Sequence, residues 1–300
     1  MYFALLGAAL LVGCLLAVQA SANLQLTKAA GTPYGASALQ LGLAAAVLAV
    51  LAVATGTIGA VALVPDVEPW HLLGGLASPL YITSGILLFP RLGALAAVGL
   101  FVTGQMFASV VLDLFGLLGL HQKPLSAGIV IGAVAVLAGI TVITRPKTRH
   151  VGWTGLGVVA GAVLPVQGAI NARLRADLHA PLAVALISFV VATLAIAVVL
   201  LFNRTPPPNL VPLKDMPWWG WLGGGCAAAY VTATFLLIPE IGAATTVVLT
   251  VTGQQLASAL IDHRGLFRMP RRPFTPARVA GLSLLVAGSL LVQFGFDPPG

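Results

Sequence analysis

Two stretches of the chain carry polar side chains at one shared spacing. Each has a glutamine, a serine and an aspartate four residues apart, namely Gln105, Ser109 and Asp113 in the first stretch and Gln254, Ser258 and Asp262 in the second. A threonine lies two residues before each glutamine, at Thr103 and Thr252. Because residues four apart lie on one face of an α-helix, each set predicts a polar stripe. Such a stripe either contacts a solute or hydrogen-bonds a neighbouring helix.

Asp113 and Asp262 end the two stripes, near the ends of the predicted helices. Two interpretations stay open for them. One is a role in gating or in coupling to an ion, H⁺ or Na⁺. The other is an anchor at the membrane interface, paired with a neighbour such as Arg264.

Two pairs of amide side chains are also four residues apart, Gln19 with Asn23 and Gln167 with Asn171. An amide both donates and accepts hydrogen bonds, so each pair suits a polar or zwitterionic solute and equally suits locking one helix to another. Pro165, beside Gln167, interrupts helical hydrogen bonding, which is found at binding sites and also at plain packing kinks.

Tyr81 and Tyr230 lie inside apolar segments rather than at their ends. Each is a candidate for cation–π contact with an ammonium solute or for a hydrogen bond to a neighbouring helix. We include both tyrosines among the candidate substrate-binding residues.

The sequence contains no pattern that predicts catalysis. It lacks the GxxxxGK[ST] phosphate loop and the HExxH zinc motif, and its five histidines show no ligand spacing. The repeated serines Ser109 and Ser258 have no repeated histidine to activate them. Cys14 and Cys226 have no CxxC partner, which argues against a disulfide framework or a metal site. We therefore expect no enzyme activity, no metal and no cofactor.

The composition indicates a membrane protein. Of 300 residues, 59% are hydrophobic and 8% are charged, whereas soluble domains carry about 25% charged residues. Several apolar runs reach the roughly 20 residues that cross hydrocarbon as a helix. The net charge of +7 sits mostly in short connections, so it indicates membrane topology rather than nucleic-acid binding. The fold class is an all-α polytopic membrane protein.

Apolar runs between Pro, Gly and charged residues predict ten spans. Pro90 and Pro239 each separate two spans with almost no loop. The ranges are 3–23, 36–60, 70–89, 94–115, 126–144, 152–172, 182–202, 218–238, 242–262 and 278–296. The first run lacks a basic leader and recurs later in the chain, so we expect it to be retained as a span.

The second five spans repeat the first five. Sixteen residues recur, 148 positions later up to the second span and 149 positions later beyond it. They are Gly7, Gly13, Gln19, Asn23, Pro33, Tyr81, Thr83, Pro90, Gly93, Thr103, Gly104, Gln105, Ser109, Asp113, Gly132 and Gly139. We call two residues related in this way repeat mates. The predicted halves are 1–147 and 148–300, and since each has an odd number of spans, the second half is inverted in the membrane.

Lysine and arginine counts predict the orientation. The connections on one side carry twelve of these residues and those on the other side carry three. Positive residues favour the cytoplasm, so both termini are predicted to lie outside. The basic run from Arg264 to Arg278 anchors this topology or contacts anionic lipid headgroups.

The stretch GAVLPVQGAINARLRADLHAPLAVALISF and the repeated TGQxxASxxxD segment resemble the YdcZ-like branch of the drug/metabolite transporter superfamily. This resemblance covers both copies and implies an antiparallel two-domain protein of the bacterial inner membrane that transports small molecules. It implies no particular substrate. Related small multidrug exporters use a glutamate in their first helix, and neither copy here has an acid there. Their proton-antiport mechanism is therefore not carried over.

The sequence thus predicts a secondary transporter or exporter of a small polar, amphipathic or cationic solute, able to work as a monomer. Its site is expected at the membrane midplane between the halves, lined by the first, third, fourth, sixth, eighth and ninth spans. The alternative is a non-transporting scaffold or sensor that binds lipid or a protein partner.

Overall fold

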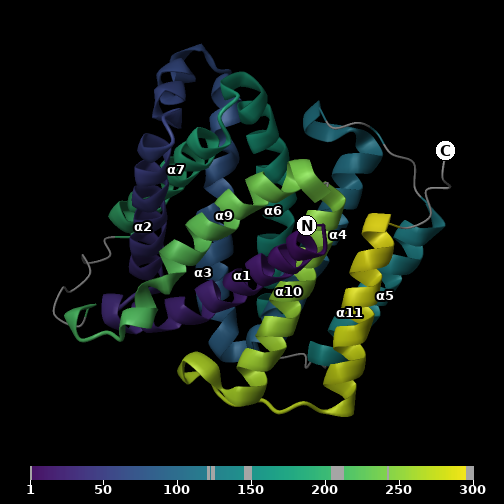
Figure 1. Cartoon of the computed structure of the whole chain (residues 1–300). Coiled ribbons are helices and arrows are strands. Elements are labelled where there is room, and N and C mark those ends of the chain that lie inside the picture. Colours follow the sequence, from purple (N-terminus) through teal and green to yellow (C-terminus); the bar gives the residue numbers. More distant parts are fainter. Residues whose placement is uncertain are drawn as a thin grey trace.

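The regular structure of the chain is helical (Figure 1). The computed structural model describes residues 2–119, 122, 126–144, 151–203, 213–241 and 243–294. The first copy comprises α1 (Tyr2–Ala30), α2 (Pro33–Ala54), the 3₁₀ helices η1 (Thr57–Asp66) and η2 (Pro69–Leu76), α3 (Ala77–Leu92), α4 (Ala94–Phe115), η3 (Leu117–Gly119) and α5 (Ala127–Thr144). The second comprises α6 (Val151–Leu178), α7 (Pro181–Phe202), η5 (Trp218–Trp221), α9 (Leu222–Ile241), α10 (Ala243–Arg264), η6 (Leu266–Arg268) and α11 (Pro276–Phe294).

Six helical segments among these residues are long and apolar enough to cross a membrane: α1, α2, η2 with α3, α4, α6 and α7. The helices α5 and α11 are apolar but shorter. These six candidate spans agree with the expectation of a polytopic all-α membrane protein.

The first and sixth helices extend further than the apolar runs that predicted them. They end at Ala30 and Leu178 rather than at residues 23 and 172. The breaks that follow are repeat mates, because Gly31 and His179 both adopt positive φ, 79° and 52°. Each break is followed two residues later by the proline that opens the next helix, where its fixed φ is favourable and its missing N–H has no cost. Amide side chains at the ends of these helices therefore lie on helix rather than in a loop.

The boundary between α3 and α4 lies at Gly93 and not at Pro90. Pro90 is inside α3, in its last turn, and the chain turns at Gly93, whose φ is 91°. A residue with a side chain would be strained in that conformation. The sequence prediction of a span boundary at Pro90 was thus three residues early.

Pairs of helices from opposite copies cross at glycines, with their backbones in direct contact. A Cβ on Gly13 of α1 would collide with the backbone of Thr250 in α10, and one on Gly253 of α10 would collide with the carbonyl oxygen of Leu10. Because a later residue of one helix meets an earlier residue of the other, α1 and α10 are antiparallel. Their repeat mates α6 and α4 cross in the same way, at Gly161 and Gly104.

The pair α5 and α11 has the same contact at both ends, side by side at one edge of the molecule (Figure 1). A Cβ on Gly132 would lie 2.7 Å from the carbonyl oxygen of Gly288, and a Cβ on Gly139 would lie 2.7 Å from that of Gly281. Gly132 and Gly281 are repeat mates, as are Gly139 and Gly288. The two helices are therefore antiparallel and are related to each other by a local two-fold axis.

The two copies interleave instead of packing as separate bodies. Helices α1 and α2 pack with α9 and α10 of the other copy, and we call these four helices the first unit. Their repeat mates, α6, α7, α3 with η2, and α4, pack together as the second unit. The units meet where α2 lies against α7 and where α4 lies against α10, and both are pairs of repeat mates. An apolar core that includes Phe89, Phe101 and Leu285 fills the space between α3, α4, α5, α10 and α11.

The glycine crossings give a direct stability test. We expect Gly13→Ala and Gly161→Ala to lower the thermal unfolding midpoint, because the added methyl group meets backbone that cannot move aside, at a cost of about 1–3 kcal/mol or more. Thermal unfolding of the detergent-purified variants measures this effect.

Gly7 and Gly155 provide matched controls in the same two helices. Nothing lies within 4 Å of a Cβ built on either residue. Alanine there should leave the midpoint unchanged or raise it slightly, since alanine favours helix by about 1 kcal/mol over glycine. Equal losses at all four positions would contradict the crossing geometry.

Candidate functional site

A cluster of polar side chains from both copies is built around Tyr81 of α3. Its hydroxyl accepts a hydrogen bond from Gln254 of α10, with 3.1 Å between Nε2 and the hydroxyl oxygen. Its ring packs against Phe101 of α4 at a centroid distance of 4.7 Å. Tyr230 of α9, the repeat mate of Tyr81, is half-buried. The structure thus brings together Tyr81 and Gln254, two of the predicted site residues, from opposite copies.

The remaining residues of the two stripes lie in different surroundings. Ser258 is fully buried and donates to the Gln254 carbonyl oxygen of its own helix at 2.6 Å. Thr103 is buried and donates to the Gly99 carbonyl oxygen at 2.8 Å. The half-buried members of the two stripes are Gln105, Ser109, Asp113 and Thr252. The buried hydroxyls are therefore satisfied within their own helices.

In the second unit the predicted amides are paired with serines. The Gln167 side chain donates to Ser78 Oγ at 2.9 Å. Asn171 and Ser188 exchange two hydrogen bonds, from Asn171 Nδ2 to Ser188 Oγ at 3.2 Å and from Ser188 Oγ to Asn171 Oδ1 at 3.3 Å. These contacts connect α6 to η2 with α3, and to α7.

In the first unit the corresponding amides are less completely paired. Asn23 of α1 donates through Nδ2 to the side-chain oxygen of Gln40 on α2. Gly223 of α9 packs against this amide, since a Cβ there would collide with Asn23 Oδ1. Three buried atoms have no hydrogen-bond partner: Gln19 Oε1, Asn23 Oδ1 and Gln40 Nε2. One donor and one acceptor are thus left unpaired where Asn23 of α1 meets Gln40 of α2.

Asp262 caps a helix of the other copy. Its carboxylate accepts the N–H groups of Ala94 at 2.7 Å and Leu95 at 3.3 Å, at the start of α4. A carboxylate is favourable there because the first N–H groups of a helix lack partners and the helix dipole is positive. The carboxylate is fully buried and forms an ion pair with Arg278 at 2.5 Å. The partner is therefore Arg278, whereas the sequence suggested a neighbour such as Arg264, which is exposed.

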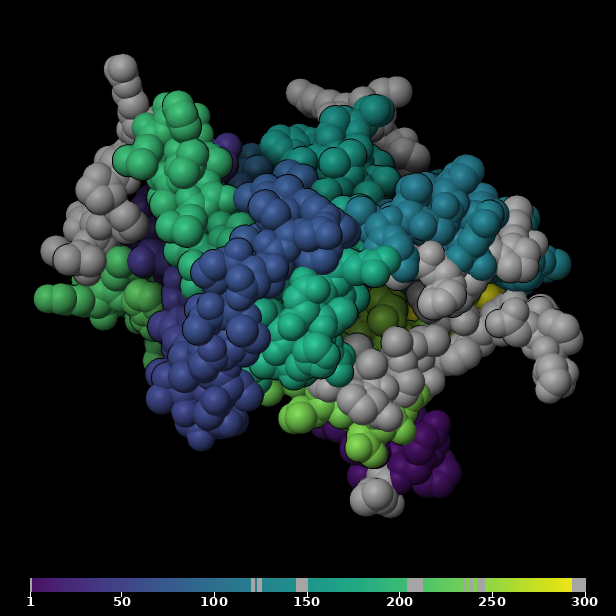
Figure 2. Space-filling view, turned by 90° about the horizontal axis from the view of Figure 1, so that it is seen from above, coloured from purple at the N-terminus to yellow at the C-terminus, as the bar shows by residue number. Residues whose placement is uncertain are grey.

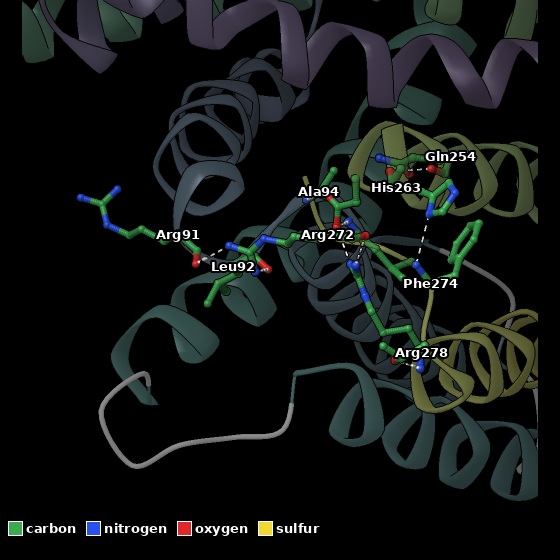
Figure 3. A network of polar contacts seen from close by, with 12 residues as sticks. Arg91, Leu92, Ala94, Gln254, His263, Arg272, Phe274 and Arg278 are labelled. Atoms are coloured by element: carbon green, nitrogen blue, oxygen red, sulfur yellow. Dashed lines mark hydrogen bonds and ion pairs between the residues drawn. The ribbon is translucent and has the colours of Figure 1, made fainter. Parts of the chain in front are cut away.

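Arg272, in the connection between α10 and α11, contacts the same region, where α3 ends and α4 begins (Figure 3). Its guanidinium donates to the carbonyl oxygens of Leu92 at 2.6 Å and Arg91 at 3.0 Å, at the end of α3. The connection itself is held by His263, whose ring stacks on Phe274 at 4.6 Å. The end of α10 and the connection that follows it thus contact both the end of α3 and the start of α4, on the two sides of the turn at Gly93.

Each end of the molecule has a matching contact between copies. Gln25, at the end of α1, donates to the Phe267 carbonyl oxygen at 3.2 Å, and its repeat mate Arg173 donates to the Leu118 carbonyl oxygen at 3.1 Å. Both acceptor residues have positive φ, 55° and 54°. The end that holds Arg173 also has a pair between His71 of η2 and Asp177 of α6, 2.6 Å apart. Figure 2 shows η1 and η2, in blue, lying beside the corner between α6 and α7.

Sequence reasoning missed Gln40, Ser78 and Ser188. Gln40 and Ser188 are repeat mates that differ in type, so a search for identical residues does not find them. A search for polar residues at mated positions inside apolar spans would have found this pair. The sequence assigns Arg278 to a topology anchor or to contact with lipid headgroups, because nothing local in the sequence connects it to Asp262.

Within the described residues, no group of three His, Cys, Asp or Glu side chains is placed to hold a metal ion. Cys14 and Cys226 are free thiols. The candidate site is therefore made of hydroxyl and amide groups.

Comparisons with known proteins agree with the repeat. The profile of a family described as "Putative inner membrane exporter, YdcZ" matches residues 4–142 and again residues 152–291. A solved structure, titled "Crystal structure of protein", is similar with a TM-score of 0.60 and 20% identity, over 95% of this chain and 96% of its own. At that identity the likeness shows a shared fold alone. No curated protein matches the sequence.

The buried ion pair is testable by a double-mutant cycle. We expect Asp262→Asn and Arg278→Gln each to lower the unfolding midpoint, because removing one partner of a buried pair leaves an uncompensated charge and costs about 3–5 kcal/mol. The double variant should lose less than the sum of the two single losses. Arg264→Gln, on the exposed side of the same helix end, is the control and should change little. Additive losses would show that Asp262 and Arg278 are not coupled.

Proposed function

This chain belongs to the YdcZ family of inner membrane exporters, and we propose that it moves a small polar solute across the membrane by alternating access. As a member of that family it is a multi-pass protein of the inner membrane and a membrane transporter rather than an enzyme. The solute type and the mechanism are our proposal. The hydrogen bond between Tyr81 of one copy and Gln254 of the other supports them most directly.

The proposed topology has ten membrane crossings in two inverted halves, residues 1–147 and 148–300. The antiparallel crossings of α1 with α10 and of α4 with α6 support it, as does the two-fold pair of α5 and α11. A helix as long as α1, 29 residues, measures about 43 Å at 1.5 Å per residue. It would therefore tilt strongly in hydrocarbon about 30 Å thick.

In the proposed orientation both termini lie outside. The contacts at the two ends support a consistent sidedness. Arg272 lies against Arg91, and both belong to connections assigned to the cytoplasm. Arg173 lies against Leu118 at the other end, and their connections are assigned to the outside.

The proposed transport path runs between the two units, around Tyr81 and Gln254. Opening toward either side requires the units to separate at one end while the other end stays closed. The junction of Asp262, Arg272 and Arg278 would be the closure at the cytoplasmic end, with Asp113 at the outer end. These aspartates are also the acids available for coupling to H⁺ or Na⁺. Because both halves are in one chain, a monomer suffices.

Flux through the purified protein tests this function. Proteoliposomes holding only this chain are given one radiolabelled solute at a time: acetamide, glycine, choline or acetate. We expect at least one to cross faster than in protein-free liposomes. Gln254→Ala should slow that flux by about fivefold to tenfold, because it removes one hydrogen bond to Tyr81 in the path.

Ser289→Ala is the matched control for that experiment. Its hydroxyl is fully buried but donates only to Leu285 of its own helix at 2.8 Å, away from the path. This variant should retain the original flux. Flux equal to that of bare liposomes for every solute would contradict transport, and unchanged flux in Gln254→Ala would remove this residue from the path.

The orientation is testable by cysteine labelling in a chain carrying Cys14→Ala and Cys226→Ala. A membrane-impermeant maleimide should label Tyr2→Cys and Leu117→Cys in intact cells, because both residues are exposed and assigned to the outside. Arg271→Cys, exposed on the opposite side, should be labelled only after the membrane is disrupted. The reverse pattern would place the termini in the cytoplasm.

A further inference from the structure

The unpaired buried polar atoms of the described residues all lie in the first unit. There are six, on five side chains: Gln19, Asn23, Gln40, Thr232 and Gln255. These residues belong to α1, α2, α9 and α10. None belongs to α6, α7, α3 or α4 as far as those helices are described. Part of this difference is burial, because Gln167 and Asn171 are half-buried whereas Gln19 and Asn23 are buried. The rest comes from the residues around them.

The difference at Gln19 comes from one lost hydroxyl. Its repeat mate Gln167 is bonded to Ser78. The mate of Ser78 is Ala227, which is buried on α9, the helix that packs against α1. The position that corresponds to Ser78 thus carries a methyl group in place of the hydroxyl that accepts from Gln167 Nε2, and Gln19 Oε1 has no partner.

Thr232 shows the same kind of loss. Its mate Thr83 is 2.9 Å from the hydroxyl of Ser37. The mate of Ser37 is Ala185, so Thr232 Oγ1 is buried without a partner. At two positions, the residue that corresponds to a hydrogen-bonding serine of the first copy is an alanine in the second copy.

The contact between Asn23 and Gln40 leaves one donor and one acceptor. Asn171 and Ser188, at the mated positions, satisfy each other in both directions. Asn23 and Gln40 share one hydrogen bond, which leaves Asn23 Oδ1 and Gln40 Nε2 without partners. If both amides are turned over, the free atoms become Asn23 Nδ2 and Gln40 Oε1. One donor and one acceptor are left free in either assignment.

We propose that Gln19, Asn23 and Gln40 form the solute subsite of the transporter, and that this subsite binds an uncharged solute bearing a primary amide or an equivalent donor and acceptor. The inference rests on the proposed transport function. A primary amide has two N–H donors for Gln19 Oε1 and Asn23 Oδ1, and a carbonyl oxygen for Gln40 Nε2. Only the first unit binds, because in the second unit Gln167 is bonded to Ser78 and Asn171 is bonded to Ser188.

The surrounding charges exclude a charged solute. Neither α1 nor α2 contains an aspartate or glutamate. In α9 and α10 the acids are Glu240, in the last turn, and Asp262, which is held by Arg278. The basic residue of α1, Lys28, is exposed in its last turn. With side chains 5%, 1% and 0% exposed, Gln19, Asn23 and Gln40 offer a cation or an anion no opposite charge to offset its desolvation.

Glycine 223 adds a steric argument. It leaves room for the Asn23 amide at the start of α9, and its mate Gly74 does the same for Asn171. The amides are therefore positioned by the fold in both units. The two units differ in whether the hydrogen-bonding groups of these amides are paired with other protein groups.

The test measures binding directly, apart from transport. Saturation-transfer NMR on the purified full chain uses three probes of one shape: acetamide, acetamidinium and acetate. Acetamide should bind, and each charged probe should bind at least about tenfold more weakly. This comparison needs no variant, so it holds even where a substitution impairs folding.

Two substitutions that copy the second unit provide the sharper test. Ala227→Ser gives Gln19 the hydroxyl that Gln167 has, and Gln40→Ser gives Asn23 the partner that Asn171 has. Each should weaken acetamide binding by about tenfold. With Ala227→Ser the unfolding midpoint should also rise or stay the same, because a free atom becomes paired. Loss of binding with gain of stability cannot come from misfolding. Ser289→Ala should leave both measurements unchanged.

The outcomes separate this inference from the transport function. Equal binding of the charged probes, no acetamide binding, or undiminished binding in both serine variants would overturn the uncharged subsite. Flux of another solute in the liposome assay would then still support transport. Acetamide binding without flux of any solute would support the subsite and contradict transport.

Discussion

The arrangement of this protein depends on the direct contact of helix backbones at mated glycines. In a membrane, helices gain little from the hydrophobic effect when they associate, so close packing and hydrogen bonds must hold them together. Gly13, Gly104, Gly161 and Gly253 permit this contact between helices of opposite copies. Because the contacts occur in mated pairs, they also fix the antiparallel relation of the copies. Within this arrangement Gln254 of α10 reaches Tyr81 of α3, in the other copy.

Fusion of the two copies into one chain allows the mated positions to differ. In a pair of identical subunits, a serine at position 78 would serve both amide sites or neither. Here Ser78 serves Gln167 while Ala227 leaves Gln19 without a hydroxyl. The same separation is seen for Ser37 and Ala185. The backbone keeps its two-fold relation while hydrogen-bonding capacity becomes concentrated on one side of it.

Much of the fold could be predicted from the sequence, because identical residues recur at a constant spacing in the two copies. Breaks at Gly31 and Gly93 agree with glycine and proline signals, although Pro90 was taken for the boundary that Gly93 makes. The candidate site was predictable in part, since Tyr81, Tyr230 and Gln254 stand out as repeated polar residues in apolar segments. Their partners were not, because Gln40 and Arg278 act through contacts far apart in sequence. Asp262 meets Ala94 across 168 residues, and periodicity carries no information at that range.

The junction at Gly93 has a consequence for biosynthesis. The Asp262 carboxylate caps the first turn of α4, and the Arg272 guanidinium donates to a carbonyl oxygen in the last turn of α3. Both residues leave the ribosome long after α3 and α4 have been made. During translation the α3–α4 hairpin therefore lacks the contacts from Asp262 and Arg272. Until they form, its helix ends are exposed to lipid headgroups or water. Completion of the first copy is a late event that the C-terminal segment of the nascent chain brings about.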